Sequence, residues 1–288
     1  MPSLKEQIAV QQISKDCYES VVPPIRMGDL ADWAYGGNIL AIAVSAAYAT
    51  VTKGHHLYSI NGYFVRPASR FEKLICRVER IRDTRTFITR HLRVYQGQGD
   101  AEQLCLIATA DFHVDEPVDM VKYSAHPQVH IPIFSAEESP KERTQEQGLY
   151  RILDKFLEVY PHSPARDEKD VSAIVSADRF RVNEPPYTEA DRIAALAFYM
   201  DRGLAYIPAN HSGYTLDMAS ACATLDFSLR FLTHEINLRD WNVSERQTCG
   251  ARNARAFSEG RVFNAEGELL ASMTQKTILR PKIGGSRI

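Results

Sequence analysis

The stretch YGGNILAIAVSAAYATVT, residues 35–52, is the part of the sequence that decides the fold. It is rich in alanine and other apolar residues and predicts a buried helix. Gly36 and Gly37 stand at its start, where glycine permits a close approach of another backbone segment. Apolar runs typical of strands follow it at residues 57–67, 73–81, 86–96 and 103–114. The first half therefore predicts one long helix followed by an antiparallel sheet.

The second half repeats this order of elements. TEADRIAALAFYMDRGLAYI, residues 188–207, predicts a helix with Thr188 as its N-cap and Pro208 after its end. Strand-like runs follow at residues 221–232, 241–249, 254–264 and 271–279. We predict an α+β fold of two tandem repeats, each with a long central helix packed on an antiparallel β-sheet. A chance likeness between two α+β halves is the alternative.

The middle of the chain predicts a linker. Residues 115–147 are rich in proline and charge and end in the polar run ESPKERTQEQG, which buries little apolar area and breaks strands and helices. The expected organisation is an N-terminal domain over residues 1–116, a linker over 117–147 and a C-terminal domain over 148–288.

Composition excludes several classes of function. The 288 residues carry a formal charge of -2 with scattered lysines and arginines, so no nucleic-acid partner is expected. Five cysteines, an odd number without a CxxC motif, favour a reducing compartment. No apolar run reaches membrane-spanning length and no signal peptide is present, so we expect an intracellular protein without stable membrane insertion. The last three residues, Ser286-Arg287-Ile288, resemble a peroxisomal targeting tripeptide without matching it, and a frayed tail is the alternative.

The common catalytic signatures are missing from the sequence. It has no G-x-S-x-G nucleophile elbow, no P-loop and no dinucleotide-binding glycine motif. The histidines lack the spacing of metal ligands; His55 and His56, for example, are adjacent. We therefore expect no cofactor and no metal.

Two polar residues stand out from apolar patterns. Asp201 lies on or beside the apolar stripe of the predicted helix at 188–207, where a carboxylate is costly unless it is hydrogen-bonded. Gln275 lies on an otherwise mostly apolar face of the last strand. Each could equally be structural, Asp201 by reaching solvent and Gln275 by satisfying a backbone group. Strand periodicity places Thr224 on the face opposite Ala223 and Leu225. It gives no reason to join Thr224 to Asp201 and Gln275.

Several segments resemble the acyl-CoA thioesterase II family, whose fold is a double hotdog. They fall in the family's order and cover both halves: AYGG (34–37), YSINGYFVRP (58–67), FYMD (198–201), ATLDFS (223–228) and GELLASMTQ (267–275). The sequence departs from the family pattern at Met200, at Phe227 and at Lys276-Thr277, which bears on substrate preference.

The resemblance implies a function and a set of catalytic residues. The family's trio of Asp, Ser or Thr, and Gln corresponds to Asp201, Thr224 and Gln275, which would hold a water that attacks the thioester of an acyl-CoA. Gly36 and Gly37 become candidates, by position only, for donating to the oxyanion. Hotdog enzymes commonly pair, so a homo-oligomer is expected.

Three other functions remain open at this stage. One is a hotdog hydratase or dehydratase, which would need a histidine near the acid; His211 is a poor but possible partner. Another is a release enzyme for a carrier-bound or polyketide thioester. The third is a non-catalytic module that binds acyl thioesters.

Overall fold

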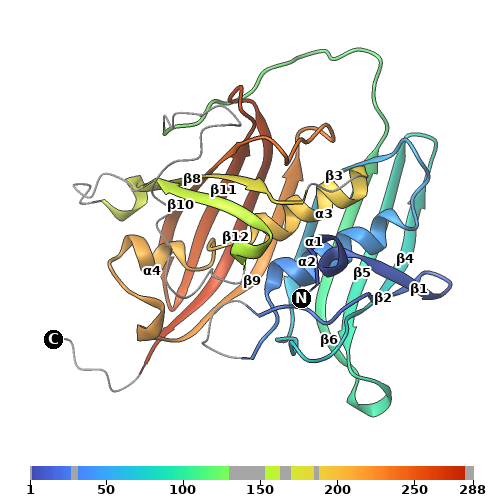
Figure 1. Cartoon of the computed structure of the whole chain (residues 1–288), viewed down its shortest axis with the longest axis horizontal. Coiled ribbons are helices and arrows are strands. Elements are labelled where there is room, and N and C mark those ends of the chain that lie inside the picture. The colour runs from blue at the N-terminus through green and yellow to red at the C-terminus, as the bar shows by residue number, and fades with distance from the viewer. Residues whose placement is uncertain (1, 27–31, 130–152, 163–169, 185–187, 283–288) are drawn as a thin grey trace.

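In the part of the chain that the structure describes, twelve strands form a single antiparallel sheet to which both halves contribute (Figure 1). The structure, a computed structural model, describes residues 2–26, 32–129, 153–162, 170–184 and 188–282. The first half of the chain supplies β1 (Val10–Ser14), β2 (Cys17–Ser20), β3 (His56–Phe64), β4 (Ile75–Asp83), β5 (Phe87–Gln96) and β6 (Gln103–His113). The second half supplies β7 (Leu157–His162), β8 (Val175–Val182), β9 (Ala219–Phe231), β10 (Asn242–Arg252), β11 (Arg255–Phe263) and β12 (Leu269–Pro281).

The order of the strands is that of two equivalent halves placed edge to edge. The sheet reads β1-β2-β4-β5-β6-β3 and then β9-β12-β11-β10-β8-β7. The second series is the first in reverse, with β9 in the place of β3. The halves join where β3 pairs with β9, from Ser59 opposite Arg230 to Tyr63 opposite Asp226. This is the predicted α+β fold of two repeats, each with its own helix.

The two long helices, α2 (Gly36–Tyr48) and α3 (Glu189–Met200), pack against each other across this seam. α2 is apolar around nearly its whole circumference and is buried, as such helices are. α3 begins with the predicted N-cap: the Thr188 hydroxyl accepts from Asp191 N–H at 3.1 Å. The Tyr35 hydroxyl donates to the Phe198 carbonyl at 2.6 Å, so one half binds the helix of the other directly. Two short helices, α1 (Leu4–Ile8) and α4 (Ile207–His211), complete the described helices.

The predicted helix over residues 188–207 was too long. α3 ends at Met200, and a turn with Gly203 at φ +75° separates it from α4. Glycine adopts this left-handed conformation readily, which ends a helix. Pro208 does not end the first helix but lies in the first turn of α4, where its fixed φ is favourable.

Four strands at the two ends of the sheet, β1, β2, β7 and β8, were not predicted. β8 carries Asp178 and Arg179, both buried, which interrupt the apolar alternation that marks a strand. Of the predicted linker 117–147, residues 117–129 form no helix or strand and residues 130–147 lie outside the described residues. Ser286-Arg287-Ile288 also lies outside them, so the domain division and the targeting tripeptide stay predictions. No helix in the described ranges is long and apolar enough to cross a membrane.

A buried ionic cluster fixes the end of α3 on the sheet. The Asp178 carboxylate of β8 accepts from the Tyr199 hydroxyl at 2.6 Å, from Arg202 Nη1 at 2.9 Å and from Arg246 Nη2. Burial alone would raise the pKa of Asp178, but the two guanidinium groups hold it below its usual range. Arg202 directly follows Asp201, so this cluster also sets the position of the turn that carries Asp201.

Replacing Asp178 should strongly destabilise the protein. Asp178→Asn leaves two buried guanidinium groups without their shared anion, which should lower the free energy of unfolding by about 3–5 kcal/mol. Urea denaturation followed by circular dichroism measures the change, with Asp119→Asn on the exposed segment after β6 as the control. A loss for Asp178→Asn as small as that of the control would show that the cluster does not anchor α3.

Candidate active site

Asp201 lies at the C-terminal end of α3, where that helix meets the start of α2. It is the C-cap residue of α3 and is only 8% exposed. Its carboxylate therefore sits in the interior at the seam between the two halves, rather than reaching solvent from the edge of the helix. A buried carboxylate needs hydrogen-bond donors around it.

The structure brings the three predicted catalytic residues together. Gln275 of β12, fully buried, donates from Nε2 to Asp201 Oδ1 at 2.5 Å. The Thr224 hydroxyl of β9 lies 3.2 Å from Gln275 Oε1 and donates to it. The amide of Gln275 thus links the carboxylate and the hydroxyl, and its orientation is fixed by both.

A bulge in β9 explains why strand periodicity could not predict the position of Thr224. In the pairing of β12 with β9, Gln275 lies opposite Phe227 and Thr277 opposite Thr224, so β9 has one residue more than β12 in this interval. An extra residue on one strand reverses the alternation of faces beyond it. Thr224 consequently shares the face of Phe227 and Gln275, although the count of residues places it on the other.

The two glycines at the start of α2 let α3 approach closely: Gly36 leaves room for the Asp201 carboxylate, and Gly37 for the backbone at Phe198. A Cβ on Gly36 would lie 2.8 Å from Asp201 Oδ2, and one on Gly37 would lie 2.4 Å from the Phe198 carbonyl oxygen. The Gly37 backbone N–H donates to the Asp201 carboxylate. The first N–H groups of a helix have no acceptor within it, so this end of α2 offers donors to an anion.

Burial raises the pKa of Asp201 to about 6, from an ordinary value of 3.8. Hydrogen bonds from Gln275 and from the Gly37 N–H oppose this rise because they favour the ionised form, and the nearby Thr224 hydroxyl acts in the same direction. At neutral pH the carboxylate is therefore mostly ionised, yet it is a much stronger base than an exposed aspartate. Such a group suits general base catalysis.

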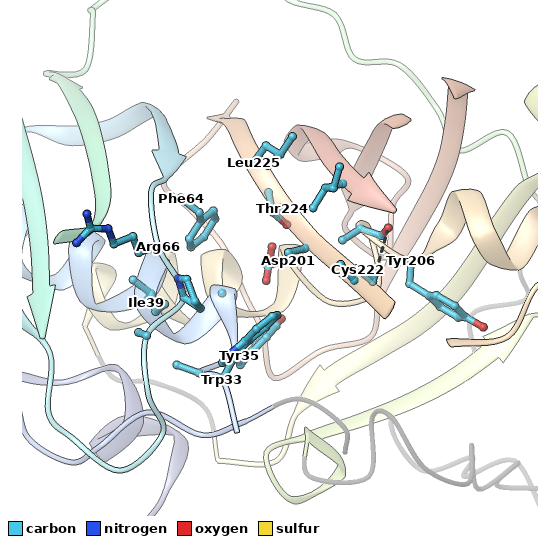
Figure 2. A pocket seen from close by; sticks show the side chains of 18 of the residues that line it. Trp33, Tyr35, Ile39, Phe64, Arg66, Asp201, Tyr206, Cys222, Thr224 and Leu225 are labelled. Atoms are coloured by element: carbon cyan, nitrogen blue, oxygen red, sulfur yellow. Dashed lines mark hydrogen bonds between the residues drawn. The ribbon is translucent and has the colours of Figure 1, made fainter. Parts of the chain in front are cut away.

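A pocket of about 460 Å³ opens onto Asp201 and Thr224 between the two halves (Figure 2). Its walls combine segments from both halves of the chain, chiefly residues 33–39 and 64–68 from the first and 201–206, 221–225, 278 and 280 from the second. Figure 2 shows the Asp201 carboxylate and the Thr224 side chain beside each other, with Phe64 close by. The pocket walls are largely apolar, with Arg66 and Arg280 as the charged exceptions besides Asp201.

Other titratable residues near the pocket do not suit catalysis. Cys222 lines the pocket, but burial raises the pKa of its thiol to about 12, so it is not a thiolate at neutral pH. No histidine lines this pocket within the described part of the chain. His211 instead contacts Ser176 through Nε2 at 2.7 Å. Three pocket residues, Arg66, Cys222 and Arg280, were not predicted from the sequence. Cys222 and Arg280 lie outside the segments that resemble the family, and Arg66 lies within the segment 58–67 without standing out from its pattern.

Comparison with known proteins identifies the family. The model of the acyl-CoA thioesterase N-terminal domain matches residues 23–113, and that of the C-terminal domain matches residues 132–279. The chain belongs to the acyl-CoA thioesterase family. Acyl-CoA thioesterase 2 of Haemophilus influenzae is 26% identical over 258 residues, which cover 85% of this chain and 87% of that protein.

Solved structures support the same assignment of the fold. An acyl-CoA thioesterase II, TesB2, from Mycobacterium marinum superposes with a TM-score of 0.75 at 20% identity, covering 99% of both chains. A protein with a hot dog fold from Alicyclobacillus acidocaldarius gives a TM-score of 0.73 at 16% identity, covering 98% of this chain and 100% of the other. The predicted family, the double-hotdog fold and the class of enzyme, a thioester hydrolase, are confirmed.

The raised pKa of Asp201 should leave a signature in protein stability. The folded state binds the proton of this carboxyl more tightly than the unfolded state, so the contribution of Asp201 to folding is most favourable below about pH 4 and declines as pH rises to about 6. Asp201→Asn removes that decline. Urea denaturation should show that the variant gains stability relative to the wild type between about pH 4 and pH 7. A difference that is constant over this range would contradict the raised pKa.

Proposed function

We propose that the protein hydrolyses acyl thioesters by direct attack of a water molecule that Asp201 deprotonates. The observation that carries this proposal is the buried carboxylate beside a pocket, hydrogen-bonded by Gln275 and with Thr224 next to it. The apolar walls of the pocket would take the acyl chain. Removal of a proton from water by a positioned base contributes about 10²–10⁴ to the rate of such reactions.

The three residues divide the work in this proposal. Gln275 occupies Asp201 Oδ1, which leaves Oδ2, the oxygen nearer Gly36, to accept the proton of the water. The Thr224 hydroxyl, close to both Gln275 and Asp201, positions the same water. Attack on the thioester carbon places negative charge on the carbonyl oxygen, and expulsion of the thiolate then yields the free acid.

The oxyanion would be stabilised by the start of α2. The Gly37 N–H already donates to Asp201, so the N–H of Gly36, the first residue of α2, is the better placed donor. The positive end of the helix dipole adds to this effect, and donors held in place before the reaction stabilise charge most effectively.

Two alternatives are less well supported by the site. A hydratase or dehydratase of this fold would need a histidine beside the acid, whereas His211 lies with Ser176 and the pocket residues described here include none. A purely binding module would have no use for a carboxylate that is kept ionised in the interior against a desolvation cost.

Loss of the base should slow hydrolysis strongly without unfolding the protein. Asp201→Asn keeps the shape of the side chain and should lower kcat for an acyl-CoA by about a hundredfold or more. Gln275→Ala should also be impaired, because the carboxylate loses its donor. The assay follows release of free thiol, and the wild-type rate should fall below about pH 6 as Asp201 becomes protonated.

Controls separate chemistry from folding in this test. Thr224→Ser retains a hydroxyl and should keep most of the activity, whereas Thr224→Val should not. Retention of activity by Asp201→Asn within about threefold of the wild type, with no thiol released by any other route, would refute the assignment of the base.

We also propose that Arg66 and Arg280 bind the phosphates of coenzyme A. Both line the pocket, both are exposed, and they come from opposite halves of the chain. Figure 2 shows Arg66 extending away from Asp201. Guanidinium groups bind phosphate through paired, charge-assisted hydrogen bonds.

A comparison of two thioesters tests this role. Arg66→Ala and Arg280→Ala should each raise KM for an acyl-CoA by about tenfold, as expected from the loss of one hydrogen bond to a charged group. The same acyl group on N-acetylcysteamine, which has no phosphate, should be hydrolysed with nearly unchanged KM. Arg252→Ala, on an exposed part of β10, is the control. Equal effects on both substrates would show that these arginines shape the pocket rather than bind phosphate.

The assembly of two or more copies of this chain into a homo-oligomer, which the family resemblance implies, stays a prediction.

A further inference from the structure

Two histidines stack on each other across the seam, far from Asp201. His56 is the first residue of β3, and His234 follows β9. Their ring centroids are 3.6 Å apart and the rings are inclined by 15°. Glu189, which contacts the stack, is the first residue of α3, and Asp201 directly follows the last. At 1.5 Å per residue the helix separates the stack from the candidate active site by about 18 Å.

Two carboxylates hold the edges of this stack. On one side, His56 Nδ1 lies 2.9 Å from both oxygens of Glu189, and His234 Nδ1 lies 3.8 Å from Glu189 Oε2. On the other side, Asp115 lies 3.6 Å from His56 Nε2 and 3.1 Å from His234 Nε2. The Tyr48 hydroxyl donates to Glu189 at 2.9 Å and fixes that carboxylate in turn.

The proton positions follow from these contacts. A carboxylate only accepts hydrogen bonds, so Glu189 requires the proton of His56 on Nδ1. When Nε2 carries no proton, its lone pair is on the side of the ring that faces Asp115. A histidine whose Nδ1–H is held by a carboxylate while Nε2 stays free is the usual arrangement of a metal-binding histidine. His56 Nε2, His234 Nε2 and the oxygens of Asp115 thus lie together on one side of the stack.

We propose that His56 Nε2, His234 Nε2 and Asp115 bind a divalent transition metal ion of the zinc class, with Glu189 orienting the histidine rings. The three ligand atoms lie within 4.8 Å of one another. Ligands at zinc distances and tetrahedral angles are about 3.3–3.5 Å apart, close to the separations between Asp115 and the two rings. Binding opens the 15° angle between the stacked rings, because the ion lies in the plane of each ring it contacts.

The position of the site indicates a structural role. His56 and Asp115 belong to the first half of the chain, and His234 and Glu189 to the second. The ion would therefore clip the two halves together beside the end of the β3–β9 pairing, where Ser59 lies opposite Arg230. An ion that binds the folded state and not the unfolded one raises Tm. The ligands come from three distant segments, which is why linear spacing predicted no metal.

Metal titration of untagged protein tests the site. After treatment with EDTA in the presence of a non-thiol reductant, addition of Zn²⁺ should show saturable binding of one ion per chain and a higher Tm. Co²⁺ should give the visible bands of a four-coordinate ion without the near-ultraviolet band of cysteine ligation, because the ligands are nitrogen and oxygen.

Variants decide between this site and adventitious binding. Asp115→Ala changes an exposed side chain and His234→Ala removes a ring; each should weaken Zn²⁺ binding at least tenfold and eliminate the rise in Tm. His55→Ala removes the adjacent histidine, which contacts Thr52 instead, and should bind as the wild type does. Thioester hydrolysis by Asp115→Ala should stay within twofold of the wild type. Absence of saturable binding, or equal binding by all three variants, would show that the cluster is an ion-pair network only and overturn the proposal.

Discussion

The hydrogen bond from Gln275 to Asp201 is the contact on which the candidate active site depends. Both side chains are buried, and a carboxylate in such surroundings is costly unless donors compensate for the lost water. Gln275 and the Gly37 N–H supply those donors, while burial still raises the pKa of Asp201 to about 6. The result is a carboxylate that is mostly ionised at neutral pH and more basic than an exposed aspartate, as the proposed role of general base requires.

The joining of two halves into one sheet creates the place for this anion. The pairing of β3 with β9 sets α2 and α3 side by side, so that the end of α3 faces the start of α2. Gly36 leaves the space for the carboxylate, Gly37 lets the backbone of α3 approach, and the buried Asp178 cluster holds the turn after Asp201. The pocket has walls from both halves, so neither half alone would contain it. The same seam brings together the residues of the proposed metal site, which are His56, Asp115, Glu189 and His234.

Much of this could be predicted from the sequence, and the limits have physical causes. Helix and strand periodicity revealed the two repeats and marked Asp201 and Gln275 as polar residues in apolar patterns. Thr224 came only from the family resemblance, because the bulge in β9 reverses the side on which it lies. Strand β8 was missed because Asp178 and Arg179 are buried charges, and the partners of Asp178 are distant in sequence. Contacts between distant segments, including those of His56 with His234, leave no periodic signal.

Isotope labelling tests the central claim, direct attack by water, most directly. A single turnover of acyl-CoA with excess enzyme in H₂¹⁸O should place one ¹⁸O atom in the released acid, and the Asp201 peptide should stay unlabelled after many turnovers. Water that attacks the thioester carbon itself gives this result. Unlabelled acid in the first turnover, or ¹⁸O in the Asp201 carboxylate, would reveal a covalent anhydride with Asp201 as nucleophile and contradict its role as general base.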